Sequence, residues 1–510
     1  MARQNPHDEP LSTDKPARRR LITTACMLAQ FMAAVESTIV GTAMPTIVGD
    51  LGGFHLFSWV FAAYLLAQAA STPVYGRLAD LYGRKRVFYV GTALFLLGSL
   101  ACGFAWGMVP LIIFRTVQGL GAGAIQPIAW TVIGDLYAPA DRARMQGWLS
   151  SVFGASAIAG PAIGAIIVER LHWSLVFWIN LPIGILTAAM LGILLEERVA
   201  PTRRRVDALG AVLLMVGVGA LLAAVVEAES LGAATVAVLA AVGTMALAVL
   251  GLHEMRVAEP IVPFRMWRRP IIAVGNFGSL VIGVVMMCNG AYLPAYVQGA
   301  MGRSPMVAGF ALGATSVLWT LGTILSARLM IRSSYRTTGI AGSVILLIGT
   351  AVLLALEPQR GPVWAAAGAA TLGLGLGFCN TTFVVAVQTS VGWAERGAAT
   401  GGNLFMRTIG QSLGAALFGA VIALGIAHRV PGAGDAVNRL LQPGTRAGLG
   451  AATAARLAGA FAAAMHDAYL VMGLFALVVL AFTWCIPARL SPTRPAAANR
   501  QGTVPGAADD

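Results

Sequence analysis

Stretches of about 20 predominantly apolar residues recur along almost the whole chain and are separated by short polar segments. A stretch of this length crosses the hydrocarbon core of a bilayer as one α-helix. Of the 510 residues, 57% are hydrophobic and only 11% are charged, which leaves too little charge to cover a water-soluble protein of this size. The sequence therefore predicts an all-α membrane protein that lies in the lipid bilayer.

The apolar stretches predict fourteen transmembrane helices, and basic residues mark one side of them. Arginine and lysine gather in alternate loops, as in the runs Arg18–Arg20, Arg84–Arg86 and Arg203–Arg205. Such loops stay in the cytoplasm, so both ends of the chain are expected there. The net charge of +13 is thus a topology signal, and no nucleic-acid partner is expected. The expected helices cover residues 21–44, 57–76, 87–107, 109–130, 145–167, 173–195, 207–227, 233–253, 271–297, 305–327, 337–356, 362–388, 402–426 and 465–487.

An internal repeat divides these helices into two sets. Residues 140–147 resemble residues 394–401 at an offset of 254, and three glycines of the fourth helix match three of the twelfth at the same offset. Two related six-helix halves around a central binding site are typical of secondary transporters. The alternative is a chance match between helices rich in alanine and glycine.

The repeat leaves the seventh and eighth helices as an inserted pair. The expected segments are a cytoplasmic tail (1–20), an N-terminal half (21–199), two inserted transmembrane helices (200–260), a C-terminal half (261–488) with a long external loop at about 427–464, and a cytoplasmic tail (489–510).

Glu36 lies deep inside the first apolar stretch, where a charged side chain costs about 2.5–3.5 kcal/mol. Counted at 1.5 Å per residue, Glu36 lies about 22 Å from the inner end of its helix. Arg115 lies about 9 Å from the outer end of the fourth helix, so both charges reach a similar level in a core of about 30 Å. The two side chains are expected to pair, or to interact through water or substrate; a neutral, hydrogen-bonded Glu36 is the structural alternative.

Neither charge is repeated, because Val285 and Ala369 stand at the corresponding positions of the second half. Arg407 in the thirteenth helix is a third intramembrane charge. It lies five or six residues from the cytoplasmic end, so its side chain can extend to the interface, and a gating role is the functional hypothesis.

Polar and aromatic side chains within the predicted helices are candidates for lining a cavity. The same residues can instead join helices, or anchor them at the membrane surface. The candidates are Gln30, Gln68, Gln126, Asn180, Asn289, Asn380, Gln388, Trp59, Tyr64, Trp130, Tyr292 and Phe383.

Two further motifs stand out between and within helices. In residues 76–87, glycines permit a tight turn, an aspartate can cap a helix, and basic residues hold the loop inside. In the fifth helix, glycines give a smooth packing face and a proline can bend the span. The residues are Gly76, Asp80, Gly83, Arg84 and Lys85 for the predicted cytoplasmic gating loop, and Gly154, Gly160, Pro161 and Gly164 for the predicted hinge between the halves.

These motifs together resemble the major facilitator superfamily. Residues 76–87 match its loop signature, with Leu81 at a position that is usually basic. Residues 36–45 resemble the first-helix motif of the fourteen-helix drug:proton antiporters, which more often begins with Asp. Residues 115–123 and 154–164 resemble the motifs of the fourth and fifth helices, and residues 259–264 resemble the segment after the inserted helices. The resemblance covers nearly the whole chain.

The resemblance implies the major facilitator fold and a multidrug efflux function. It implies export of amphipathic or cationic drugs or toxic metabolites in exchange for protons by alternating access, with Glu36 and Arg115 at the coupling site and no cofactor beyond the proton gradient. A dedicated exporter of one metabolite or antibiotic is the alternative, followed by a proton-coupled importer on the same fold. A monomer in a bacterial cell membrane is expected.

The sequence also argues against other classes of protein. It contains no HisGluxxHis, GlyxSerxGly or Walker-type sequence, so neither hydrolysis nor ATP-driven pumping is expected. The five cysteines are dispersed through apolar stretches without the spacing of metal ligands, so no metal site is expected.

Overall fold

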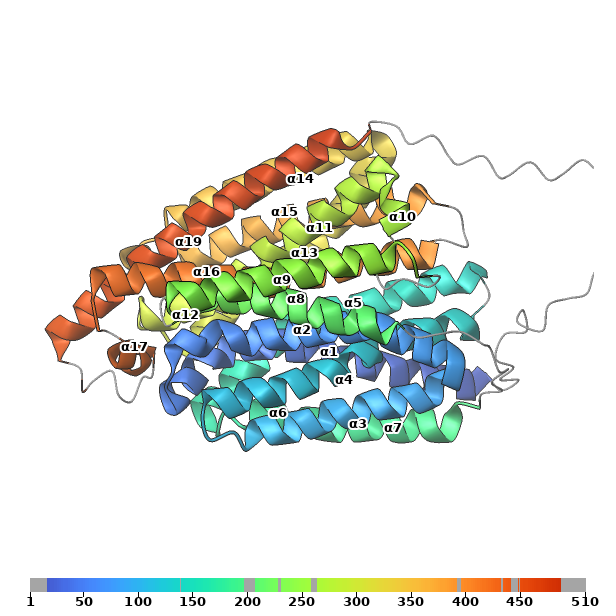
Figure 1. The fold of residues 1–510 in the computed structure, drawn as a ribbon, viewed down its shortest axis with the longest axis horizontal. Helices are drawn as coiled ribbons and strands as arrows, with labels where there is room; N and C mark the ends of the chain where they lie inside the picture. Colours follow the sequence, from blue (N-terminus) through green and yellow to red (C-terminus); the bar gives the residue numbers. More distant parts are fainter. Residues whose placement is uncertain are drawn as a thin grey trace, which may run out of the picture.

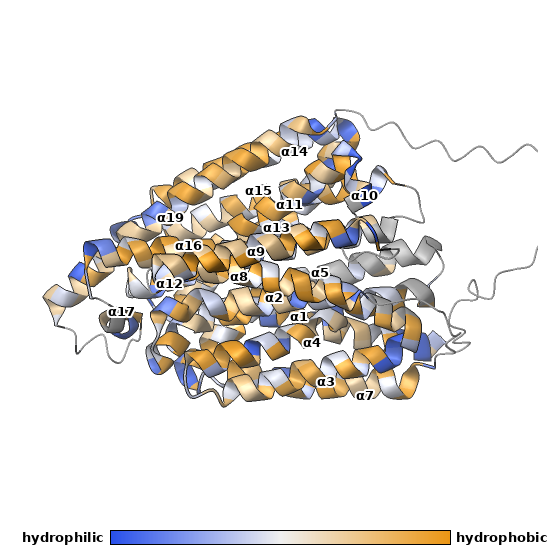
Figure 2. Cartoon of the chain, viewed as in Figure 1, coloured by the Kyte–Doolittle hydropathy of each residue, from blue (hydrophilic) through white to orange (hydrophobic). Residues whose placement is uncertain are grey.

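The computed structural model describes residues 16–487, except for 138, 197–206, 228–230, 258–263, 392–395, 433, 442–447 and 449. The described residues form helices and connecting turns, with no strand among them. Among these described residues, thirteen helical segments are long and apolar enough to cross a membrane. A further helix, α5 (Pro139–Arg170), has 32 residues and stands where the fifth span is predicted, although several of its side chains lie outside the described set. Figure 2 shows apolar residues along the middles of the helices and polar residues at their ends. The predicted all-α membrane fold is confirmed.

The first six predicted spans form one group of helices, shown from blue to teal in Figure 1. The sixth span consists of two consecutive segments, and Ile179 between them keeps helical backbone angles (φ −59°, ψ −24°), so the span continues through this residue. The elements are α1 (Pro16–Leu51), η1 (Phe54–Leu56), α2 (Phe57–Tyr82), α3 (Arg84–Gly103), α4 (Met108–Leu136), α5, α6 (Leu175–Trp178) and α7 (Asn180–Leu194).

The last six predicted spans form the second group, shown from yellow-green to red in Figure 1. A π-helical turn, η2, interrupts the ninth span at Cys288–Tyr292. The elements are α11 (Pro270–Met287), η2, α12 (Leu293–Gly299), α13 (Pro305–Arg332), α14 (Tyr335–Leu354), η3 (Pro358–Arg360), α15 (Gly361–Thr389), α16 (Arg396–Arg429), α17 (Gly434–Leu441) and α19 (Ala451–Cys485).

The glycines of the repeat pack in the same way in both groups. In α4, Gly119 lies against the backbone of α2 at Tyr64, and Gly121 lies against α3. In α15, Gly373 lies against the backbone of α13, and Gly375 lies against α14. A side chain at any of these positions would overlap the neighbouring helix, so the glycines allow close packing. The repeat seen in the sequence is therefore also a repeat in helix packing.

The two groups meet along α5 and α13 and along α2 and α16. Two inserted helices, α8 (Ala208–Val226) and α9 (Ala233–Glu254), pack against each other, and α8 also packs against α2 and α16. A short helix, α10 (Phe264–Trp267), precedes α11. The start of α1 and the end of α19 lie at the same end of the bundle, opposite α17 (Figure 1). The predicted limits of the halves and tails, and their orientation in the membrane, stay predictions.

Several side chains join the two groups near α17, at what we call the closed end. Gly41 of α1 lies against the backbone of Gly290, and Gln298 donates a hydrogen bond to the carbonyl oxygen of Thr42 at 3.1 Å. The ring of Phe57 in α2 lies 5.2 Å from that of Tyr292. The backbone groups and rings of the two halves are thus in direct contact at this end.

The segment predicted as a long loop at about 427–464 is largely helical. α16 continues to Arg429, α17 occupies residues 434–441, and α19 begins at Ala451, fourteen residues before the predicted span. Residues 451–464 contain many alanines, which favour helix even outside the bilayer. The helix thus begins before the predicted span, because hydropathy locates the bilayer whereas helix propensity determines where the helix begins; the external position of this segment stays a prediction.

Candidate functional site

Glu36 lies in the middle of α1, on the side that packs against α4 and α7. Its side chain has no exposed surface. One carboxylate oxygen accepts a hydrogen bond from Nη1 of Arg115 in α4 and forms an ion pair with that guanidinium. The other accepts a hydrogen bond of 2.6 Å from Nδ2 of Asn180. Both oxygens of the buried carboxylate therefore have a donor.

Arg115 makes several contacts besides this ion pair. Its Nη1 donates to Oε1 of Gln118 at 2.6 Å, and its Nε donates to the carbonyl oxygen of Val60 at 3.3 Å. The guanidinium lies over the ring of Tyr64, 4.0 Å from the ring centroid, and 5.8 Å from the centroid of Phe177. Aromatic faces attract cations, most strongly where water is absent. Arg115 is therefore held from several directions, only one of which is a carboxylate.

The polar side chains around this pair form a closed ring of hydrogen bonds. Nε2 of Gln118 donates to Oγ of Ser99 at 2.6 Å, and Nδ2 of Asn180 donates to the same oxygen at 3.1 Å. Glu36, Arg115, Gln118, Ser99 and Asn180 are each at most 1% exposed. The ring joins α1, α3, α4 and α7, carries one positive and one negative charge, and has no contact with water.

This burial makes the site sensitive to the charge of each member. Removing one partner of a buried ion pair costs about 3–5 kcal/mol, because the other charge is left without compensation in a medium of low dielectric constant. Adding a proton to Glu36 would likewise leave the guanidinium without an anionic partner. A change in the charge of either partner would therefore disturb the packing of the four helices that the ring joins.

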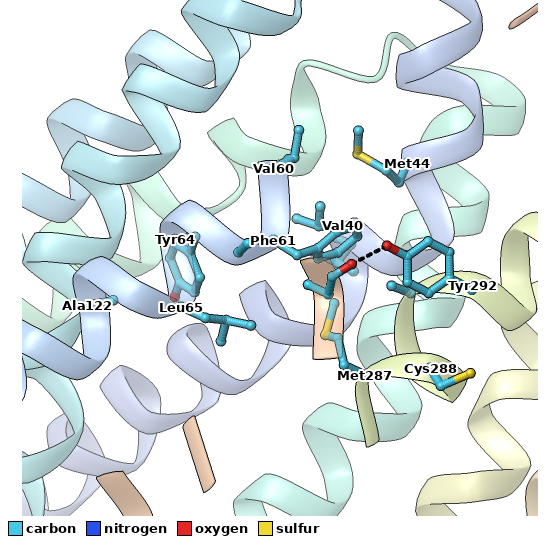
Figure 3. Close-up of a cluster of buried hydrophobic side chains, with 14 of the residues drawn as sticks. Val40, Met44, Val60, Phe61, Tyr64, Leu65, Ala122, Met287, Cys288 and Tyr292 are labelled. Atoms are coloured by element: carbon cyan, nitrogen blue, oxygen red, sulfur yellow. Dashed lines mark hydrogen bonds between the residues drawn. The ribbon is translucent and has the colours of Figure 1, made fainter. Parts of the chain in front are cut away.

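Apolar side chains of the closed end lie beside this ring. Figure 3 shows Val40 and Phe61 of the first two helices beside Met287 and Tyr292 of the second group. The hydroxyl of Tyr292 donates a hydrogen bond of 2.6 Å to the carbonyl oxygen of Ala415, which fixes the ring across this contact. The two halves are thus sealed by side chains directly beside the polar ring.

The structure brings together four of the residues that the sequence singles out, namely Glu36, Arg115, Asn180 and Tyr64. The depth estimate placed the two charges at the same level, and they are in direct contact. Gln118 and Ser99 were not predicted. Gln118 follows Arg115 by one helical turn, a spacing that places both on one face of α4 and could have identified it.

The other cavity candidates lie outside the ring. Asn289 donates to Oγ1 of Thr315 at 2.9 Å, and Phe383 is fully buried against Gly278 of α11. Gln30 is fully buried, and its amide nitrogen and oxygen have no hydrogen-bond partner among the described residues. Gln68 and Gln126 are partly exposed. Their predicted role as cavity lining stays a prediction.

The predicted gating loop between α2 and α3 is shorter than the sequence suggests. Gly83 alone makes the turn, with φ of 89°, a conformation that favours glycine. Gly76 lies inside α2, which continues to Tyr82, so the expectation that it helps to form the turn was wrong. Arg84 and Lys85 begin α3 and are partly buried, and the side chain of Asp80 lies outside the described residues.

The residues predicted as a hinge in α5 face two different neighbours. Gly160 and Gly164 lie against α1 at Thr38 and Ile39, within the same half. Contacts with α13 of the other half occur at Gly154, near Thr320, and at the carbonyl group of Pro161. The glycines therefore allow close packing inside one half as well as between halves, and the hinge role stays a prediction.

Arg407 lies in α16, eleven residues after the helix begins at Arg396. Its Nη1 donates to Oδ1 of Asn380 in α15 at 3.2 Å. The side chain thus bonds to a neighbouring helix of the same half, and the gating role stays a prediction. Within the residues that the structure covers, no group of three or more His, Cys, Asp or Glu side chains is arranged to hold a metal ion.

Comparison with known proteins shows to which family this chain belongs. The chain is similar to multidrug resistance protein 3 of Bacillus subtilis, with 34% identity over 416 residues that cover 80% of this chain and 81% of the relative. It is also similar to the multidrug transporter protein MdtP of the same organism, with 33% identity over 80% of this chain and 76% of the relative.

Solved structures show the same fold at low sequence identity. The fold is similar to a bacterial homologue of the human lysosomal transporter Spinster in an inward-facing conformation, with a TM-score of 0.68 and 16% identity over 94% of this chain and all of that structure. The D-xylose–proton symporter gives a TM-score of 0.62 with 12% identity over 92% of this chain and 98% of that structure. The model of the Major Facilitator Superfamily matches residues 26–415. The chain is therefore a multi-pass membrane transporter, not an enzyme, and it belongs to the major facilitator superfamily.

Proposed function

We propose that this transporter exports amphipathic or cationic drugs or toxic metabolites in exchange for protons, by alternating access of one site between its two halves. The buried ion pair between Glu36 and Arg115 is the observation that supports proton exchange. Burying two charges costs desolvation free energy even when both have hydrogen-bond partners. A buried pair that is kept despite this cost indicates a function beyond stability. The multidrug transporters among its relatives support the class of substrate.

In this proposal, Glu36 is the group that takes up and releases the proton. When Glu36 is protonated, the guanidinium of Arg115 keeps Gln118, the carbonyl oxygen of Val60 and the ring of Tyr64 as partners. These contacts would continue to stabilise the positive charge of the arginine after Glu36 has lost its negative charge. Ser37, the next residue of α1, is exposed, so accessible surface lies one residue from the carboxylate. A small movement of α1 would then connect Glu36 to water.

Alternating access requires contacts between the halves that can break and form again. The closed end supplies such contacts at Gly41, Phe57 and Tyr292, next to the polar ring. Protonation of Glu36 would weaken its hold on α4 and α7, which the ring joins to α1. We propose that this change in packing is what links the proton to movement of the two halves.

The test is transport by the full-length protein in inside-out membrane vesicles, with ethidium as the amphipathic cation. Export corresponds to uptake into vesicles whose interior has been made acidic, and it should stop when the proton gradient is collapsed. Glu36→Gln should abolish this uptake while the protein remains inserted and folded. Glu357→Gln is the matched control, because Glu357 is an exposed carboxylate paired with Arg360 at 3.9 Å, and it should leave uptake unchanged.

Two results would contradict the proposal. Full gradient-driven uptake by Glu36→Gln would remove Glu36 from proton coupling. Uptake that instead requires protons to move in the same direction as the substrate would show an importer on this fold.

A further inference from the structure

The C-terminal half contains a charged residue that the proton-coupling site does not use. Arg407 lies eleven residues into α16, or about 16 Å along the helix. Its partner Asn380 lies nine residues before the end of α15 at Thr389, or about 14 Å along that helix. The hydrogen bond between them joins α16 to α15 at this distance from the ends of both helices.

Arg407 differs from Arg115 in having no anionic partner in the part of the chain that the structure describes. Its one observed hydrogen bond goes to the neutral amide of Asn380, and its Nε is buried without an acceptor. The described carboxylates of this half, Glu357 and Asp467, form their ion pairs with Arg360 and Arg429. The ring in the first half is neutral, so Arg407 adds an uncompensated positive charge to the interior of the protein.

The surroundings of this charge indicate water. Arg407 and Asn380 are both partly exposed, although each lies within a helix that packs against several others. An arginine that faced hydrocarbon would be costly, and intramembrane charges almost always face the bundle interior or a water-filled cavity. The exposed side of this pair is therefore open to a polar ligand.

We propose that Arg407 and Asn380 form an anion-binding position that takes the carboxylate group of an amphipathic substrate. A guanidinium can bind a carboxylate through two parallel N–H donors. The hydrogen bond from Nη1 to Oδ1 of Asn380 orients that amide so that its NH2 group becomes a further donor beside the arginine. The N–H groups of the guanidinium, including Nε, and the NH2 group of Asn380 then lie close together beside one positive charge. The observed hydrogen bond to Oδ1 of Asn380 leaves some of these donors without an acceptor among the described residues.

This inference rests on the proposed transport function and adds to its substrates amphipathic compounds that carry an anionic oxygen group, zwitterions included. The test uses dansyl-phenylalanine and its methyl ester, which share one apolar body and differ in the carboxylate. Binding to the purified full-length protein is measured by dansyl fluorescence without a proton gradient. The acid should bind about 10–100-fold more tightly than the ester, as charge-assisted hydrogen bonds would give.

Two substitutions test the residues themselves. Arg407→Gln should abolish the preference for the acid. Asn380→Asp should do the same without removing the arginine, because the new carboxylate would occupy the guanidinium from within the protein. Arg360→Gln, which removes an exposed arginine at the far end of α15, should keep the preference.

The outcomes separate this inference from the function on which it rests. Equal binding of acid and ester by the native protein, or a preserved preference in folded Asn380→Asp, would overturn the anion-binding position. If Arg407→Gln fails to fold, Asn380→Asp still decides. A native protein that prefers the acid but shows no gradient-driven ethidium uptake would retain the position and refute the proposed exchange.

Discussion

One added methyl group at Gly41 should disturb the closed end. Gly41 in α1 faces Gly290 of η2 across the contact between the halves. A Cβ atom at position 41 would lie 2.6 Å from the carbonyl oxygen of Gly290, at least 0.4 Å inside the 3.0 Å limit that real Cβ contacts respect. The obstacle is a backbone atom, so a change of rotamer cannot relieve the overlap.

The size of the effect follows from where the overlap occurs. Overpacking by one methyl group typically costs about 1–3 kcal/mol. The cost applies only while α1 and η2 are in contact, so the Gly41→Ala variant should shift the population toward the conformation in which they separate. At about 1.4 kcal/mol per factor of ten, the shift is roughly 5–150-fold.

The assay is the labelling rate of a cysteine in the closed contact by a membrane-impermeant thiol reagent. Ser58→Cys is suitable because Ser58 is 1% exposed and packs against Gly419 of the other half. The five native cysteines are first replaced by alanine. Gly290→Ala is the matched control, because a Cβ on that side of the same contact would have no atom within 4 Å.

Labelling should rise strongly in Gly41→Ala and stay near the native rate in Gly290→Ala. Equal rates in the two variants would show that this contact does not hold the halves together. If labelling increases only when the reagent is added on the side of the membrane where the chain termini lie, the end opposite α17 has opened. That result would refute the reasoning.

Two further substitutions test the packing around the polar ring. Asn180→Ala removes the donor to Oε2 of Glu36 and should lower the free energy of unfolding by about 1–3 kcal/mol, measured as a lower thermal midpoint in detergent; an unchanged midpoint would show that water replaces the amide. Gly160→Ala should destabilise the protein by a similar amount because its Cβ would overlap the hydroxyl of Thr38 in α1, whereas Gly251→Ala, which meets no atom within 4 Å, should not.

The number and order of the helices could be predicted from the sequence because bilayer thickness fixes the length of each apolar stretch. The contact between Glu36 and Arg115 could also be anticipated, since depth along a helix depends only on the rise per residue. The position of Glu36 was counted from the inner end of its helix and that of Arg115 from the outer end, and the two counts place the charges at the same level. Features that depend on how the helices pack against one another were harder to predict from the sequence.

Ser99 shows why the rest of the ring was not predicted. A serine in a transmembrane helix commonly bonds to its own backbone, so nothing in its sequence context marks it as an acceptor for Gln118 and Asn180. Asn180 reaches Glu36 because it lies on the face of the sixth span that packs against α1, and hydropathy does not reveal that face. The hydrogen bond of Arg407 to Asn380 was not predicted either, because the sequence does not show which side chains of neighbouring helices meet.

The two contacts between the halves differ in whether another helix covers them on the side that faces lipid. Where α2 meets α16, the inserted helix α8 packs on both, with α9 beside it, and Nε1 of Trp59 in α2 donates to Glu227 at the end of α8 at 3.1 Å. Where α5 meets α13, the two helices pack directly on each other. A hydrophobic compound that diffuses within the membrane therefore meets a two-helix wall on one flank and a single helical junction on the other. The inserted pair makes an otherwise twofold molecule one-sided in the plane of the bilayer.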